Sequence, residues 1–264
     1  MQPSTVNGTE LGAQEWRDTL FLRYVLDLLY LTTYCDGCNT KFNICHTLKC
    51  KRGGLVTERH NELHDGFADL AGKAFTPSYV HDNPLIFAGR AVKRTKATPA
   101  GASGTTEWDR APPPEVTEQK GDLLIRELWQ NGTESVHEMY VVNTYAKSHR
   151  AKIPEKCLQE AERGKKRMYL EAYPQQLRIF FPFVDSVDGM MKGEATTTLK
   201  RLASRLSTKW KQPYSKTCGY VNSRIATTLV RSTHRCIRVS RVPAHRIIVQ
   251  RPQWEDGAGL KIFR

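Results

Sequence analysis

Four side chains that commonly bind metal lie within sixteen residues near the N-terminus. Cys35 and Cys38 form a CxxC pair, and His46 and Cys50 follow with three residues between them. Two cysteines, a histidine and a further cysteine complete the tetrahedral shell of a structural Zn²⁺, and a separation of four residues places two ligands about one helical turn apart. The spacing predicts a compact zinc knuckle. The alternative is that cysteines here act as small core residues, as Cys45 could.

Two acidic side chains fall on a predicted hairpin further along the chain. The apolar runs at residues 122–129 and 135–142 flank an Asn-Gly turn signal, so they are expected to pair as strands. Asp122 opens the first strand and Glu138 lies inside the second, which would bring them together at the open end. Nucleases use two carboxylates on adjacent strands to hold a divalent ion at the scissile phosphate. A turn residue and an exposed strand residue would be the simpler interpretation.

A lysine-rich helix is expected after the hairpin, at residues 154–173. It carries Lys165 and Lys166, with Tyr169 about one turn further on, and a strand at residues 177–184 follows it. A lysine beside two carboxylates can orient or deprotonate an attacking water and stabilise charge on the phosphorane. Hairpin, helix and strand in this order therefore favour phosphodiester chemistry.

The positive charge of the chain is concentrated near its C-terminus. The formal net charge is +13, and residues 195–254 contain thirteen Lys and Arg but no Asp or Glu. One sign of charge over so long a stretch favours a polyanionic partner over a merely solvated surface. An amphipathic helix at residues 194–210 places leucines on one face and a basic row on another. This row, predicted to bind nucleic acid, is Arg201, Arg205 and Lys209.

The remaining elements follow from hydrophobic periodicity and from breakers. A short helix is expected within residues 16–34, and a second from Thr57, as its cap, to residue 74 after the break at Gly53-Gly54. Arg59, His60 and Glu62 begin the second helix on its polar side, where they could reach a phosphate or simply be solvated. Nucleic-acid binding is predicted for Arg59, His60 and Asn61. A further helix is expected at residues 220–231, and the Thr, Ala, Gly, Ser and Pro content of residues 90–120 predicts a flexible loop.

These elements predict an α/β (α+β) chain in four parts: a disordered N-terminus at 1–15, a helix with a knuckle at 16–56, a mixed sheet flanked by helices at 57–240, and a basic, Gly-rich tail at 241–264. Seven cysteines without a signal peptide fit a reducing, intracellular compartment. The most apolar run, 20–34, contains Arg23 and Asp27 and is too short to span a bilayer.

The order of these motifs resembles the C-terminal part of non-LTR retrotransposon reverse transcriptase polyproteins, from about residue 16 to the end. The resemblance is carried by the CxxC-x7-H-x3-C knuckle, the Arg59-His60-Asn61 tripeptide and Lys120-Gly121-Asp122. In that family a restriction-like endonuclease of the PD-(D/E)xK type follows the polymerase and nicks the DNA at which reverse transcription is primed. The resemblance implies a restriction-endonuclease-like sheet, Mg²⁺ or Mn²⁺ as catalytic cofactor, DNA and element RNA as partners, and a nuclear location.

The resemblance also implies roles for individual residues. Asp122 would be the first metal carboxylate, Glu138 would take the place of the family's usual Asp, and Lys165 or Lys166 with Tyr169 would match the lysine and tyrosine of the helix. The chain departs from the pattern at Asn83, Asn143 and Tyr145, where acids are expected. A Glu in place of Asp also shifts the carboxylate by roughly an ångström, which catalytic geometry feels strongly.

Nothing in the chain resembles a polymerase palm domain with its paired aspartates. Three interpretations remain open from the sequence. The chain is an active Mg²⁺-dependent DNA-nicking enzyme, or a zinc-dependent nucleic-acid binder that has lost its metal site, or a transposon relic that folds poorly.

Overall fold

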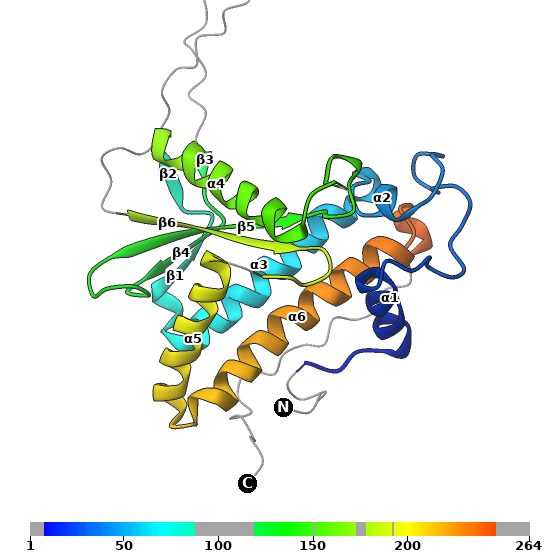
Figure 1. Ribbon diagram of the computed structural model, residues 1–264. Coiled ribbons are helices and arrows are strands. Elements are labelled where there is room, and N and C mark those ends of the chain that lie inside the picture. The colour runs from blue at the N-terminus through cyan, green and yellow to red at the C-terminus, as the bar shows by residue number, and fades with distance from the viewer. Residues whose placement is uncertain (1–7, 88–118, 150, 173–177, 192, 247–264) are drawn as a thin grey trace, which may run out of the picture.

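A mixed four-stranded sheet forms the centre of the computed structural model, which describes residues 8–87, 119–149, 151–172, 178–191 and 193–246 (Figure 1). The strand order is β1-β4-β5-β6, with the first three strands antiparallel and β6 parallel to β5. A two-stranded ladder of β2 and β3 lies beside it. The strand bounds are β1 Val80–Asp82, β2 Leu85–Phe87, β3 Gln119–Lys120, β4 Leu123–Arg126, β5 Glu134–Val142 and β6 Arg178–Ser186.

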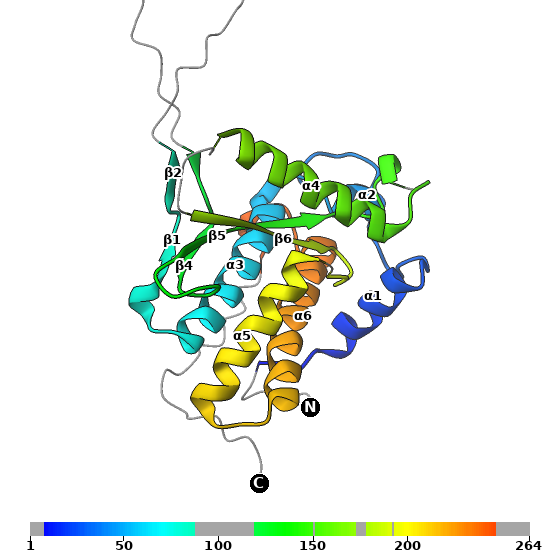
Figure 2. The same cartoon turned by 60° about the vertical axis from the view of Figure 1, so that its left-hand side comes forward.

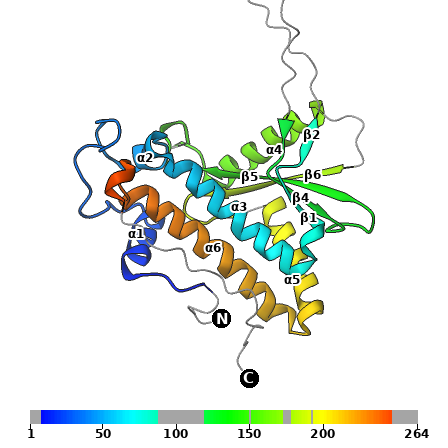
Figure 3. The same cartoon turned by 180° about the vertical axis from the view of Figure 1, so that it is seen from behind.

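Helices cover both faces of the sheet (Figure 2). The lysine-rich helix α4 (Pro154–Ala172) lies on one face, whereas α3 (Leu55–Ala74) and α5 (Glu194–Trp210) pack on the other. The long helix α6 (Tyr214–Arg238) lies beside α3 (Figure 3) and leads back to α1 (Ala13–Arg23) and α2 (Ile44–Thr47). Short 3₁₀ turns are Arg52–Gly54, Pro77–Tyr79, Lys147–His149 and Pro243–His245. The expected fold class and the order of hairpin, helix and strand are confirmed.

The main core lies between the sheet and the helices α3, α5 and α6. Every apolar residue whose periodicity predicts helix α3 is buried, and the ring centroids of Phe67 and Phe183 are 4.8 Å apart. On α5, Leu199, Leu202 and Leu206 are buried in the same cluster. Burial of one such side chain contributes about 1.5–3 kcal/mol, so these two helices are held on the sheet mainly by apolar contacts.

The helix expected within residues 16–34 is wrong in extent. Helix α1 ends at Arg23, and the chain then turns through positive φ angles of 56° at both Val25 and Tyr30. Tyr24 and Tyr30 are 68% and 90% exposed, whereas Leu28 is buried. The nearly continuous apolar run has no 3.6-residue period, so its sequence could not mark where the helix ends.

Two other helix boundaries differ from expectation. Gly54, with a φ of 74°, takes the N-cap position of α3, so Thr57 lies inside the helix and does not cap it. Helix α6 extends over 25 residues, beyond both ends of the predicted 220–231. Its buried row from Tyr220 to Ile237 is interrupted by buried threonines, a buried serine and Arg224, which weakened the periodic signal.

Several predicted segments lie outside the described residues. These are residues 1–7 of the N-terminal segment, residues 88–118 of the predicted loop and residues 247–264 of the predicted tail. Residues 119–120 of the loop form β3, and residues 241–246 pack against the knuckle. Among the helices that the structure describes, none has the length and apolar character needed to cross a bilayer.

Candidate functional site

The four predicted zinc ligands form one cluster. Their ligand atoms all lie within 4.8 Å of one another, with Cys35 Sγ 3.9 Å from Cys50 Sγ and Cys38 Sγ 3.4 Å from His46 Nε2. His46 lies on α2, and the Cys50 amide donates to its carbonyl at 2.9 Å, so the last two ligands are one helical turn apart as predicted. The cluster could bind one Zn²⁺.

The protonation of the cluster also suits a metal. The hydrogen bond with Thr40 is the main cause that lowers the pKa of the Cys38 thiol to about 7. Burial, with the charges of Arg241 and Lys49, lowers the pKa of His46 and so favours neutral imidazole. Thiolate and neutral imidazole are the metal-binding forms. Cys45 is not a member of the cluster, because its thiol donates to the Tyr145 carbonyl at 2.9 Å.

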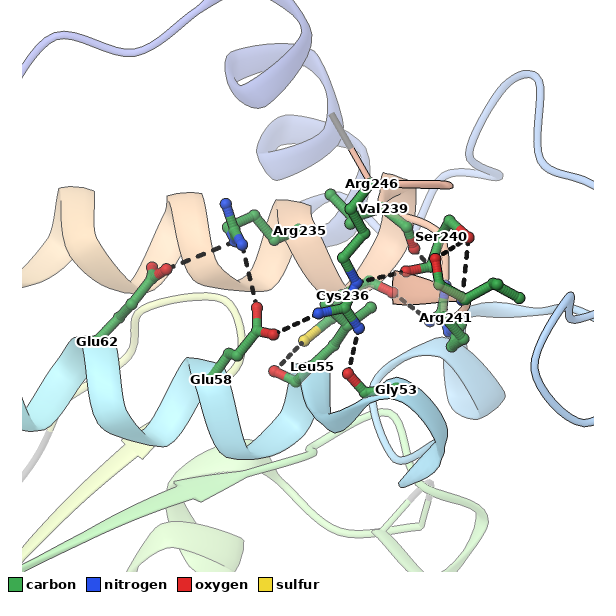
Figure 4. A network of polar contacts seen from close by, with 11 residues as sticks. Gly53, Leu55, Glu58, Glu62, Arg235, Cys236, Val239, Ser240, Arg241 and Arg246 are labelled. Carbon is green, nitrogen blue, oxygen red and sulfur yellow. Dashed lines mark hydrogen bonds and ion pairs between the residues drawn. The ribbon is translucent and has the colours of Figure 1, made fainter. Parts of the chain in front are cut away.

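A segment from the other end of the chain holds the knuckle in place. We call residues 239–246, which follow α6, the C-terminal brace (Figure 4). The Ser240 hydroxyl donates to Asp36 at 2.6 Å, and the Arg241 amide donates to both oxygens of the same carboxylate. Asp36 lies between Cys35 and Cys38, so the brace bonds directly to the loop that carries two ligands.

The same brace contacts the second half of the knuckle. The Arg241 guanidinium donates to the Thr47 carbonyl at 3.3 Å, next to His46. Arg246 donates to Glu58 at 2.6 Å and to the Gly53 carbonyl, which ties the brace to the beginning of α3 (Figure 4). Loss of a residue that orients metal ligands typically lowers metal affinity by about 10- to 100-fold.

The acidic group lies on the face of the sheet that α4 covers. Leu123 is paired with His137 in the β4–β5 ladder, so the next step along both strands sets Asp122 opposite Glu138. The Met139 amide donates to Asp122 Oδ2 at 2.6 Å, which fixes this carboxylate at the strand end. From α4, the Lys165 ammonium donates to Glu138 Oε1. Asp122, Glu138 and Lys165 are thus brought together.

Two histidines of α3 complete this group. His60 Nε2 is 3.4 Å from Asp122 Oδ1, and His64, one turn further on, is 3.0 Å from the Asp122 carbonyl and 3.6 Å from Asp82. Burial alone would raise the pKa of Asp122, but the hydrogen bond and charge of His60 outweigh it and the pKa is lowered. The Asp122 hydrogen bond correspondingly raises the pKa of His60. His64 was missed, although a spacing of four residues puts it on the same helix face as His60.

The other residues predicted for catalysis lie elsewhere on α4. Lys166 donates to Glu194 at the start of α5. The Tyr169 ring stacks on Phe180 with centroids 3.5 Å apart, in an apolar cluster with Leu124. Of the two lysines, Lys165 is the one at Glu138. That any of these residues is catalytic stays a prediction.

The Arg-His-Asn tripeptide divides into three different positions. Arg59 was expected on a polar face, and this is wrong, because it is 4% exposed and donates to the Leu48 carbonyl at 3.4 Å. His60 faces Asp122, and Asn61 is exposed. Only two of the three therefore remain accessible for a nucleic acid.

Much of the basic C-terminal stretch is engaged inside the fold. Arg201 and Arg205 donate to carbonyls of the β4–β5 connection, and Lys209 donates to the carbonyls of Lys73 and Phe75 at the end of α3. On α6 and in the brace, arginines pair with acids from the first 70 residues: Arg224 with Asp69, Arg235 with Glu58, Arg238 with Asp18 and Arg246 with Glu58. The absence of acids from residues 195–254 therefore does not make their surface uniformly basic, because acids from earlier elements neutralise these arginines.

No protein-family model matches the sequence, and no curated protein matches it either. The described residues form an α/β fold in which a Cys₃His cluster that could bind zinc is followed by helix α3, which packs on a mixed sheet. Helix α3 contributes His60, strands β4 and β5 position Asp122 and Glu138, and α4 contributes Lys165 to the same group.

Proposed function

We propose that this chain is a DNA-nicking endonuclease module of the non-LTR retrotransposon type, which hydrolyses a phosphodiester bond with a divalent metal. The observation that carries the proposal is the convergence of Asp122, Glu138 and Lys165 on one face of the sheet, from the two hairpin strands and α4. Two carboxylates with an adjacent lysine are a constellation suited to phosphodiester hydrolysis.

The carboxylates fit a Mg²⁺ or Mn²⁺ ion. Glu138 Oε2 is buried and has no hydrogen-bond partner among the described residues, so it is an acceptor that lacks a cation or donor. Asp122 is held with its other oxygen toward His60. Carboxylate oxygens are the ligands that Mg²⁺ prefers. A bound ion would polarise the scissile phosphate and lower the pKa of a coordinated water.

The side chains of the chain have separate tasks in this proposal. The Lys165 ammonium, held by Glu138, is placed to orient the attacking water and to stabilise negative charge on the phosphorane. His60 keeps Asp122 ionised by holding a proton next to it. The zinc knuckle fixes the start of α3 and thereby the position of His60.

Nicking of supercoiled plasmid DNA tests the proposal. With Mg²⁺ or Mn²⁺ the wild-type chain should convert supercoiled to open-circular DNA, and Asp122→Ala or Glu138→Gln should lose this activity. Glu134→Gln is the matched control, because Glu134 lies on the same strand and face, roughly 13 Å away. Activity that survives Asp122→Ala, or that Glu134→Gln removes equally, would contradict the assignment.

A second candidate is a zinc-dependent nucleic-acid binder on the same fold that no longer cleaves. It is favoured by the residues that stand where acids are expected. Asn143 Oδ1 accepts from the Tyr145 backbone amide at 3.0 Å, so this side chain is used in a turn. The backbone N–H of Asn83 donates to the Asp122 carbonyl at 2.9 Å. DNA binding without nicking in either metal would support this candidate.

A further inference from the structure

The knuckle has three basic side chains around an open hollow beside the zinc ligands. Lys49, Lys51 and Arg52 line this hollow together with Cys38, His46 and Cys50. All three basic residues are exposed. Within the described part of the chain, none of the three side chains makes a hydrogen bond or ion pair, in contrast to most arginines of α6.

The described residues supply no counter-charge in the lining of the hollow. None of those that line it is acidic, and no Asp or Glu occurs in the sequence between Asp36 and Glu58. Both of these acids are already engaged, Asp36 by the backbone amide of Arg241 and Glu58 by Arg235 and Arg246.

The hollow keeps a net positive charge when zinc is bound. Zn²⁺ with three thiolates and a neutral imidazole has a net charge of about −1, so the three basic side chains leave the hollow at about +2. Helix α3 begins at Leu55, three residues after Arg52, and its N-terminal end adds partial positive charge.

We propose that this hollow binds the phosphate backbone of duplex DNA, with Lys49, Lys51 and Arg52 each contacting a phosphate. The inference rests on the proposed function and adds a DNA-contact surface to it. Among the described residues, no Phe, Tyr or Trp lines the hollow, and its one imidazole, His46, is a candidate zinc ligand. The hollow therefore offers charge to a backbone and no platform for unstacked bases.

The hollow lies near enough to the acidic group for one DNA duplex to contact both. His60, which contacts Asp122, lies five residues after Leu55, or roughly 7.5 Å along the axis of α3, and Arg52 lies three residues before Leu55. A DNA strand advances about 3.4 Å per nucleotide along the helix axis. In this proposal the hollow therefore contacts phosphates within a few nucleotides of one bound at Asp122.

The test compares variants in DNA binding without Mg²⁺, so that nicking plays no part. In the triple variant Lys49→Gln, Lys51→Gln, Arg52→Gln, the affinity for a short labelled duplex should fall on the order of a hundredfold at about 0.1 M salt. The slope of log K against log salt should decrease by about 2.7, and by about 0.9 for Lys49→Gln alone. The control variant removes three other exposed lysines, Lys200, Lys211 and Lys216, and should change both quantities much less.

Zinc content separates loss of contact from loss of fold, and each variant should retain about one zinc per chain. The single variant Lys49→Gln decides the matter if the triple variant loses its zinc, because it changes one exposed side chain that is not itself a ligand. An unchanged salt slope in Lys49→Gln and the triple variant, or an effect on RNA without one on DNA, would overturn the inference while leaving the proposed function. Failure of the wild-type chain to bind DNA at all would overturn both.

Discussion

Gly53 and Arg241 lie so close together that a side chain at position 53 would overlap the brace. A Cβ atom there would be 2.7 Å from the Arg241 Cα and 2.8 Å from Arg246 Nη2. Gly37 is in the same situation on the other side of the knuckle, with its Cβ position 2.6 Å from the Arg241 Cβ. Arg241 therefore lies between two glycines of the knuckle, so the Cys₃His cluster packs against a segment about two hundred residues away.

This contact predicts different outcomes for two neighbouring glycines. Gly53 and Gly54 have almost the same φ, 72° and 74°, but a Cβ on Gly54 would meet nothing within 4 Å. Gly54→Ala should cost only the backbone strain, about 1–2 kcal/mol. Gly53→Ala should cost distinctly more and should speed zinc loss to a competing chelator, because the brace must move. Equal thermal shifts and equal zinc release in the two variants would show that the brace contact is unimportant.

The zinc cluster predicts that the metal supplies much of the folding free energy of the knuckle. The wild-type chain should contain about one zinc, which Cys38→Ser should remove, and the segment around residues 35–52 should then become sensitive to protease. Cys45→Ser is the matched control, because this thiol lies within the knuckle and bonds to a carbonyl instead. A metal-free knuckle that resists protease would contradict a structural role for zinc.

The sequence was most informative where a pattern is local. The ligands at residues 35–50 and the hairpin with its Asn-Gly turn are set by spacing alone, and both are found as expected. Helix α5 was also correct to the residue, because Gly193 precedes its regular leucine row and Lys211 in the left-handed conformation ends it.

Contacts between distant segments could not be obtained in this way. Nothing in the sequence around Arg241 indicates that it bonds Asp36, and nothing around His60 indicates Asp122. The charge of the basic stretch at residues 195–254 was overestimated for the same reason. Asp18 and Asp69, which neutralise Arg238 and Arg224, are more than 150 residues away in the sequence. Charge counted along a chain says little about charge on a surface when helices such as α6 pair with much earlier elements.

A buried acid on β6 predicts how stability depends on pH. Asp185 is fully buried, its two carboxylate oxygens have no hydrogen-bond partner among the described residues, and burial raises its pKa to about 8. Between an unfolded-state pKa of about 3.9 and the folded value, the folded state holds one more proton, so stability falls as the pH rises through this range. Above about pH 8 the loss is complete.

The variant Asp185→Asn should remove this dependence. It should be more stable than the wild type at neutral pH, on the order of 4 kcal/mol at pH 7, and the difference should vanish near pH 4. Asp27→Asn, at an exposed position after α1, is the control for a change of charge alone. Denaturant unfolding at several pH values measures the free energy of unfolding of the wild type and of each variant. An Asp185→Asn variant that is less stable than the wild type at pH 8 would show that the carboxylate has a partner in solution.

The two neighbouring lysines of α4 give the sharpest test of the acidic group. Lys165 bonds Glu138, whereas Lys166 bonds Glu194 at the start of α5, so only the first belongs beside the proposed metal carboxylates. Lys165→Gln should reduce the nicking rate by about two to three orders of magnitude, the loss typical of one group that stabilises transition-state charge. Lys166→Gln, which removes the same charge one residue away, should leave the rate within severalfold of the wild type and act mainly on stability. Single-turnover nicking with enzyme in excess separates the two effects from DNA affinity. Equal loss in both variants would mean that the lysines act through general charge, and a loss confined to Lys166→Gln would place the reactive centre away from Asp122 and Glu138.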